Sequence, residues 1–324
     1  MAIAAPIAGV FGSCVGCMML VEQLATTEPG CMNLMTFASF LFISVEGLLF
    51  TARFFTVKNH IPIMGYSKLV VIFFIVNVVN NQALNFHVPV PLHIIFRSGS
   101  LLASLTLGVL LLHRRYTMRK YGSVLMITAG IIVVTLATGS KGKGDADDGV
   151  SEQHRFFYWT IGITMLTFAL IASAYLGITQ ERLYTKYGKR PREALFYVHF
   201  LSLPAFGFMY NDIAKHVLLF NDSAPWQLPV LGVRLPEMWI YLFLASIAQY
   251  ACIRCVYVLT SECTSLTVTL VVTLRKFISL LISIWYFENP FTATHWLGTA
   301  LVFLGTLLFT DWHPTNTAAN KKTN

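Results

Sequence analysis

The stretch SLTVTLVVTLRKFISLLISIWYF, residues 265–287, indicates the fold class most clearly. It is apolar over a length that matches the roughly 20 residues of a transmembrane helix. Arg275 and Lys276 interrupt it near its middle. Because an ionisable side chain at that depth costs at least about 2.5–3.5 kcal/mol on insertion, a charge inside a span by default marks a site or a pathway. The stretch therefore predicts a membrane helix that carries functional charge.

The rest of the chain has the same character. Its 324 residues are 56% hydrophobic and 12% charged, and the mean hydropathy is +0.64, as is typical of an all-α integral membrane protein. The first apolar stretch lacks a basic flank, so we expect a retained helix and not a signal peptide. Ten stretches are long enough to span: 3–21, 32–52, 64–84, 90–112, 118–137, 156–179, 194–210, 235–258, 265–287 and 293–309.

The positive charges indicate the orientation. With ten spans both termini share one face, which receives most of the Lys and Arg residues, including Arg53 and Arg254. The positive-inside rule makes this face cytosolic. Asn221 and Ser223 frame an N-glycosylation sequon on the other, lumenal face, in agreement with that orientation. The lumenal face receives only Lys141, Lys143, Arg155, Lys215 and Arg234.

A linker divides the chain into two halves. Residues 139–154, GSKGKGDADDGVSEQH, are Gly-rich, charged and without periodicity. We expect a first five-helix repeat at 1–138, a lumenal linker at 139–155, a second repeat at 156–311 and a cytosolic tail at 312–324. Laying Arg97 on Arg275 also pairs Gly130 with Gly305 after a shift of three residues. Since five spans are an odd number, the two repeats are expected to be inverted.

The internal charges predict a binding cavity. Arg97, Arg275 and Lys276 fall within predicted spans, at related positions of the two halves. Glu46 is the acid that lies well inside a span, and it can neutralise one of the three cations at most. The alternative is that these cations snorkel to the interface or form a structural ion pair with Glu46.

Polar and aromatic residues supply further candidates for the site. Asn77, Asn80 and Asn81 lie at helical spacing, either as contacts between helices or as cavity lining. Phe196, Tyr197, His199 and Tyr250 lie in the seventh and eighth spans, where aromatic residues more often serve as packing or interface anchors.

The six cysteines include two C-x-x-C pairs, Cys14 with Cys17 and Cys252 with Cys255. Their surroundings lack the polar residues and the spacing of a zinc module, so we expect buried thiols and no metal site. No cofactor is expected either.

The excess of internal positive charge points to an anionic substrate. Three cations against one acid favour a ligand of about two negative charges, and a diphosphate suits Arg and Lys donors. An empty cationic cavity is costly to carry across the bilayer, so we expect obligatory exchange of anions.

The chain also resembles the nucleotide-sugar transporters of solute carrier family 35, in their UDP-xylose and UDP-N-acetylglucosamine branch. The resemblance covers nearly the whole chain and is carried by PGCMNLMTFASFLFISVEG at 29–47, VVNNQALNF at 78–86, PLHIIFRSGSL at 91–101, EALFYVHFLSLP at 193–204 and SLTVTLVVTLRKF at 265–277. It implies the drug/metabolite transporter fold of ten helices, location in the Golgi or endoplasmic reticulum, and exchange of a cytosolic UDP-sugar for lumenal UMP.

The resemblance also suggests roles for single residues. Arg97 and Lys276 match the basic residues that line the phosphate pocket in related carriers, and Phe196-Tyr197 matches an aromatic motif that contacts the nucleotide. Val198-His199 replaces the Asn pair of GDP-mannose carriers, so guanine recognition is not carried over.

The expected partners follow from this interpretation. They are UDP-sugars, UMP and membrane lipid, and not nucleic acid; a homodimer is left open. Lys321 and Lys322 match a dilysine retrieval signal read by cytosolic coat proteins, which favours the endoplasmic reticulum over the Golgi. The alternative function is an integral membrane enzyme acting on a nucleotide-linked or lipid substrate, for which Glu46 alone is a poor catalytic set.

Overall fold

Helices make up most of the computed structural model, which describes residues 4–86, 88–113, 115–141, 152–188, 190–227, 234–262 and 265–309. Two short strands pair antiparallel, with Trp226 opposite Leu235. The elements in chain order are α1 (Ala4–Thr27), α2 (Met32–Phe50), α3 (Ile63–Leu84), α4 (Val90–Ser98), α5 (Ser100–Leu112), α6 (Met118–Lys141), α7 (Glu152–Tyr187), α8 (Pro191–Ser202), the 3₁₀ helix η1 (Leu203–Met209), α9 (Tyr210–Asn221), β1 (Pro225–Gln227), β2 (Arg234–Pro236), α10 (Glu237–Glu262), α11 (Ser265–Tyr286) and α12 (Ala293–Phe309).

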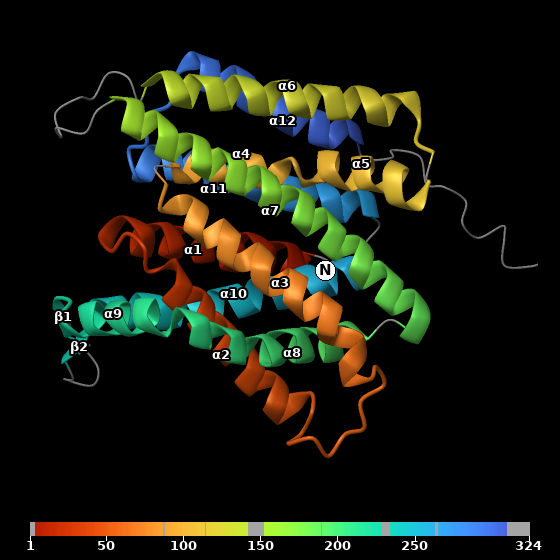
Figure 1. Ribbon diagram of the computed structural model, residues 1–324, viewed down its shortest axis with the longest axis vertical. Coiled ribbons are helices and arrows are strands. Elements are labelled where there is room, and N and C mark those ends of the chain that lie inside the picture. Colours follow the sequence, from red (N-terminus) through yellow and green to blue (C-terminus); the bar gives the residue numbers. More distant parts are fainter. Residues whose placement is uncertain are drawn as a thin grey trace, which may run out of the picture.

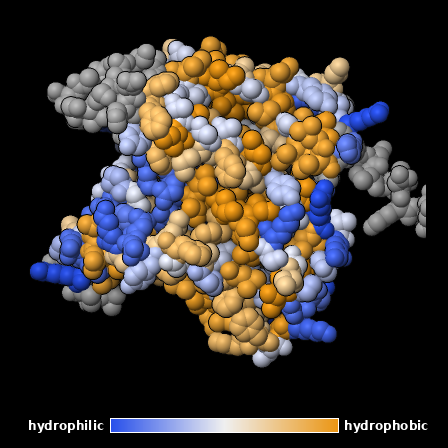
Figure 2. Space-filling model, viewed as in Figure 1, coloured by the Kyte–Doolittle hydropathy of each residue, from blue (hydrophilic) through white to orange (hydrophobic). Residues whose placement is uncertain are grey.

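The surface confirms the prediction of a helical membrane protein. Within the described ranges, seven helical segments are long and apolar enough to cross a bilayer: α1, α2, α3, the α4–α5 pair, α6, α7 and α10. Hydrophobic residues form a broad band across the molecule, and hydrophilic residues gather towards its left and right edges (Figure 2). Because most helices run from left to right in the same view (Figure 1), the band crosses them as a lipid belt would.

Two of the predicted spans are interrupted. The span predicted at 90–112 breaks at Gly99, where an added Cβ would meet the Cδ1 atom of Ile131 at 2.5 Å. The span predicted at 194–210 is an α-helix only as far as Ser202 and continues as the tighter η1, which has Pro204 in its first turn. The first break leaves Arg97 in the last turn of α4, where backbone carbonyls lack their full set of helical partners.

The helices pack in antiparallel pairs that lie side by side in Figure 1. In the α6–α12 pair the backbones are close enough for a Cβ at Gly130 to meet the Gly298 carbonyl oxygen at 2.5 Å. In the α1–α10 pair Cys14 lies opposite Cys252. A large apolar cluster around Leu92, Ile127 and Val302 joins α4, α6 and α12 and supports one side of the site.

The helices also reach into the predicted linker. α6 continues to Lys141 and α7 begins at Glu152, so both extend into residues 139–155. Residues 142–151 and the predicted tail at 312–324 lie outside the described residues.

Candidate functional site

A cavity of ≈ 440 Å³ lies between α2, α3, α4, α7, α8 and α10. Three guanidinium groups line it, from Arg97, Arg192 and Arg254, and the carboxylate on its wall is Glu46. Apolar walls around a few convergent polar groups are the usual form of a ligand site. The excess of positive charge suits an anion.

Arg97 and Lys276, predicted from the two halves, meet beside this cavity, which Arg97 lines and Lys276 does not. Arg97 is exposed, whereas its neighbours Phe96 and Ser98 are buried. The Nζ atom of Lys276, on α11, donates to the backbone carbonyl of Arg97 at 3.4 Å. The accepting carbonyl lies in the last turn of α4, which ends at the break at Gly99. The ammonium group of Lys276 is close enough to the guanidinium of Arg97 for the two charges to repel each other.

Arg275 points to another partner. Its Nη1 atom donates to the Sγ atom of Cys252 on α10 at 3.3 Å. It remains close enough to Arg97 and Lys276 for the three charges to repel one another. Such a cluster gains most when an anion binds to it.

Glu46 does not pair with any of these three cations. Its carboxylate accepts a short hydrogen bond from the Tyr250 hydroxyl and lies 3.9 Å from the Nη1 atom of Arg254. The cation nearest to Glu46 is thus Arg254, which the sequence assigned to the cytosolic face, and not one of the three internal cations for which a pair with Glu46 was considered. The charge of Arg97 is left available to a ligand.

The three asparagines differ in role. Asn77 lines the cavity, and its Nδ2 atom donates to the Phe73 carbonyl at 2.8 Å. Asn81 joins α3 to α2 through the Thr36 hydroxyl at 2.7 Å. Asn80 bonds within its own helix, to the Val76 carbonyl. Both readings of the stripe thus apply, cavity lining for Asn77 and helix contact for Asn81.

The aromatic candidates are also divided. Phe196 and His199 line the cavity and are buried. A Cβ at Gly47 would lie 2.5 Å from the Cδ2 atom of Phe196, so only a glycine on α2 allows this ring its place. Tyr197 does not line this cavity but stacks on Tyr66, with ring centroids 5.3 Å apart.

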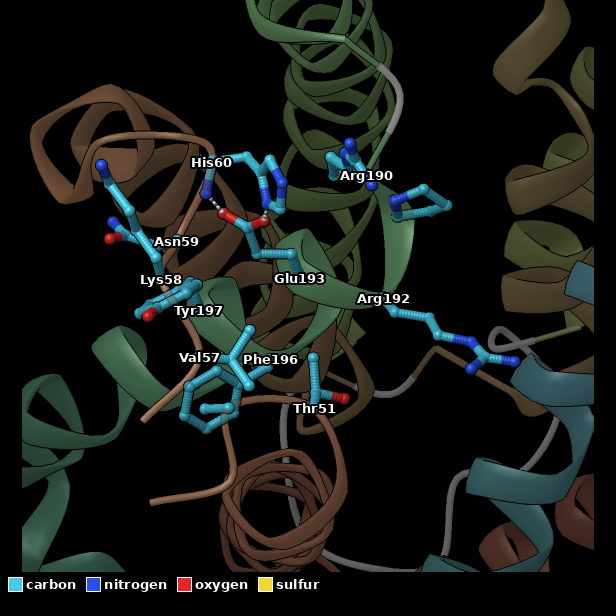
Figure 3. A pocket seen from close by; sticks show the side chains of 12 residues that line it. Thr51, Val57, Lys58, Asn59, His60, Arg190, Arg192, Glu193, Phe196 and Tyr197 are labelled. Carbon is cyan, nitrogen blue, oxygen red and sulfur yellow. Dashed lines mark hydrogen bonds and ion pairs between the residues drawn. The ribbon is translucent and has the colours of Figure 1, made fainter. Parts of the chain in front are cut away.

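A smaller pocket of ≈ 270 Å³ adjoins the cavity, because Thr51 and Phe196 line both. Figure 3 shows Glu193 at its centre, directed at His60. The Oε1 atom of Glu193 accepts from the backbone N–H groups of His60 and Ile61, each at 3.0 Å, and from the Tyr66 hydroxyl at 3.2 Å. Glu193 therefore fixes the α2–α3 loop against the start of α8.

Comparison with known proteins identifies the family. The family model described as "UAA transporter family" matches residues 2–313. The chain belongs to the UAA transporter family.

Two curated relatives of this UAA transporter are about equally similar to it. The "UDP-xylose and UDP-N-acetylglucosamine transporter" of Danio rerio is 51% identical over 93% of this chain and 92% of its own length. The "Endoplasmic reticulum GDP-fucose transporter" of Drosophila melanogaster is 51% identical over 93% of this chain and 88% of its own. Both names denote transporters and not enzymes.

A solved crystal structure supports the fold. It has a TM-score of 0.52, covers 94% of this chain and 97% of its own, and is 15% identical. At that identity the likeness concerns the fold alone.

Several polar residues of this UAA transporter's cavity, and one buried acid outside it, were not predicted from the sequence. Arg192, Arg254 and Gln249 line the cavity. The two arginines were counted with the cytosolic face because they lie near the ends of apolar stretches. Buried Glu22, beyond the predicted end of the first span, lies in α1 and accepts from Ser283 at 2.5 Å and from Asn289 at 2.9 Å. The sequence feature that could have pointed to Glu22 is its position directly after the apolar stretch 3–21.

The expectation of six free thiols was wrong. Cys14 and Cys252 form a disulfide that links α1 to α10, with their Cα atoms 4.8 Å apart. Sequence spacing does not reveal such a long-range approach. Cys17, Cys31 and Cys255 are free, and Cys263 lies outside the described residues. Over the part of the chain that the structure describes, no group of three or more His, Cys, Asp or Glu residues is arranged to hold a metal ion.

Proposed function

We propose that this protein is a nucleotide-sugar antiporter, which moves UDP-N-acetylglucosamine, UDP-xylose or both from the cytosol into the lumen in exchange for UMP. The observation that carries the proposal is the meeting of Arg97 and Lys276 beside the cavity. Neither pairs with Glu46, so both remain available to the diphosphate of a nucleotide sugar.

The proposal includes ten spans in two inverted repeats, and the helix contacts support it. α1 packs on α10 as α7 packs on α3, and α2 packs on α10 as α8 packs on α3. Matching Gly130 with Gly305 also matches Ser123 with Gly298. A Cβ at Gly130 would meet the Gly298 carbonyl oxygen at 2.5 Å, and one at Gly305 would meet the Ser123 carbonyl oxygen at 3.0 Å. Equivalent contacts of this kind are expected of a two-fold repeat axis in the membrane plane.

Alternating access needs one open and one closed end. The cavity is lined by the last turns of α2 and the first turns of α8, next to the 51–62 loop, which the positive-inside rule places in the cytosol. Near the other end, the Glu22 carboxylate joins α1 to Ser283 on α11 and to Asn289 beyond it. In our proposal these bonds close the lumenal side while the cavity faces the cytosol.

The relatives do not distinguish uracil from guanine as the nucleobase, because those named for UDP-sugars and for GDP-fucose are equally similar to this chain. Asn77, Gln180 and Gln249, which carry amide groups, line the cavity. An amide presents one donor and one acceptor side by side, which complements the imide edge of uracil. We therefore favour a uridine nucleotide.

The test is uptake of radiolabelled nucleotide sugars into vesicles containing the purified protein. In obligatory exchange the carrier reorients to the outside mainly with an anion bound, and internal UMP supplies that anion. We therefore expect vesicles preloaded with UMP to take up UDP-N-acetylglucosamine or UDP-xylose about tenfold faster than empty ones. Protein-free vesicles are the control. Equal rates in loaded and empty vesicles would refute exchange, and faster uptake of GDP-fucose than of both UDP-sugars would refute the substrate.

We also propose residence in the endoplasmic reticulum, with coat proteins reading Lys321 and Lys322. Both residues lie outside the described part of the chain, and the cytosolic placement of the tail follows from the charge distribution. Changing both lysines to Ser should shift a fluorescent fusion from the reticulum to the Golgi, because a receptor-read signal acts only through its own residues. Reticular fluorescence that persists in the double variant would contradict the role of the tail.

A further inference from the structure

In the cytosolic part of the cavity, Glu46 and Arg254 carry charges to which the proposed phosphate site at Arg97 and Lys276 gives no role. Glu46 lies one turn before the end of α2, and Arg254 faces it from α10. Tyr250, one turn before Arg254, donates its hydroxyl to the same carboxylate. The guanidinium of Arg254 also lies over the Tyr250 ring, 5.7 Å from its centroid. The three side chains form one unit across the α2–α10 contact.

The ion pair in this unit is loose. The Nη1 atom of Arg254 lies 3.9 Å from the nearest oxygen of Glu46, beyond hydrogen-bond distance. The Arg254 side chain is 42% exposed and the Glu46 side chain 20%. A guanidinium has five N–H donors, so most of those on Arg254 remain free for a ligand. A structural ion pair would be expected to be closer and less accessible.

Arg192 adds a second guanidinium at the same level. It is the second residue of α8, lines both pockets, and lies near enough to Tyr250 to affect it electrostatically. In Figure 3 its side chain extends away from the His60–Glu193 pair. Any anion that enters from the smaller pocket therefore passes Arg192.

We propose that Arg254, with Arg192 beside it, forms a second anion subsite nearer the cytosolic opening than Arg97 and Lys276, which binds a phosphate of the nucleotide. In the empty carrier the Glu46 carboxylate attracts the Arg254 guanidinium. When a nucleotide binds, its phosphate takes the place of this carboxylate as the partner of Arg254. A guanidinium can donate two parallel hydrogen bonds to a phosphate. The Glu46 carboxylate, 3.9 Å away, accepts no such bonds from Arg254. Glu46 keeps the Tyr250 hydroxyl as its partner. This inference rests on the proposed function. The subsite would give the phosphates of the proposed substrate a second point of contact.

The two partners then have opposite effects on substrate affinity, and exchange into UMP-loaded vesicles measures them. R254Q removes the phosphate contact and leaves Glu46 to repel the anion, so its KM should rise about tenfold at unchanged Vmax. E46Q frees Arg254, so its KM should fall about threefold. The double variant should lie between wild type and R254Q. Arg115→Gln, an exposed cation outside the cavity, is the matched control.

A purely structural pair gives a different pattern. In that case E46Q and R254Q both lower the yield of folded protein and change KM in the same direction, which overturns the proposal. An R254Q value of KM within about twofold of wild type overturns it as well. R254K covers the case in which R254Q does not fold: it keeps the charge but loses the fork, so its KM should still rise about threefold. An unchanged KM for R254K contradicts the subsite.

A binding measurement separates this inference from the proposed function. Pyrophosphate should raise the melting temperature of purified wild-type protein and raise it less in R254Q, because a ligand of the folded state stabilises it. If wild-type vesicles take up no nucleotide sugar but pyrophosphate stabilises wild type more than R254Q, the proposed function fails and the subsite stands. Equal stabilisation of both proteins overturns the subsite whatever the transport result.

Discussion

Arg97→Ala is expected to abolish nucleotide-sugar uptake while the protein still folds, and Lys276→Ala is expected to do the same. Arg97 is exposed in the cavity, and no carboxylate among the described residues pairs with it. Removing it therefore leaves no internal partner unsatisfied. Losing one partner of a desolvated charge contact costs about 2–5 kcal/mol, or at least about thirtyfold in uptake.

The measurement is initial uptake into UMP-loaded vesicles at equal amounts of folded protein, judged by gel filtration in detergent. Arg115→Ala is the matched control, because Arg115 is an exposed cation on the expected cytosolic face and does not line the cavity. Full uptake by either the Arg97 or the Lys276 variant would show that the phosphate binds elsewhere.

Gly130→Ala is expected to destabilise the fold strongly. The added Cβ would lie 2.5 Å from the Gly298 carbonyl oxygen and 2.9 Å from the Val302 backbone nitrogen. Because both obstacles are backbone atoms, α6 and α12 must separate along their whole contact. Overpacking of this kind costs about 1–3 kcal/mol, and we expect the upper end of that range. A lower melting temperature in detergent would measure it.

Gly122 offers a control on the same helix. A Cβ there meets nothing within 4 Å. Gly122→Ala should therefore leave the melting temperature unchanged or raise it slightly, since Ala is favoured over Gly in a helix by up to about 1 kcal/mol. If both variants behave alike, the close approach of α6 and α12 is not what stabilises this part of the fold.

The sequence predicted the features that insertion into lipid enforces. Apolar stretches coincide with helices because a spanning backbone must satisfy its own hydrogen bonds. Arg97 and Lys276 stood out because internal charge is costly, and the structure brings them together from α4 and α11. The break between α4 and α5 at Gly99 was not predicted, because the apolar pattern continues through it and the close approach of Ile131 to Gly99 comes from a distant part of the chain.

Residues near the ends of spans were harder to assign. Arg254 was counted by its place in the chain, yet α10 continues to Glu262 and turns this cation into the cavity. The Cys14–Cys252 disulfide joins residues 238 positions apart, a separation over which helix periodicity carries no information. Glu22 escaped notice because its partners, Ser283 and Asn289, come from the other half of the chain.

An experimental structure of the purified protein with a nucleotide sugar bound would show whether Arg97 and Lys276 hold the phosphates of the substrate. We predict that the diphosphate lies in the cavity of ≈ 440 Å³, with its oxygens within hydrogen-bond distance of the Arg97 guanidinium and the Lys276 ammonium group. A bound nucleotide whose phosphates contact neither residue would contradict it.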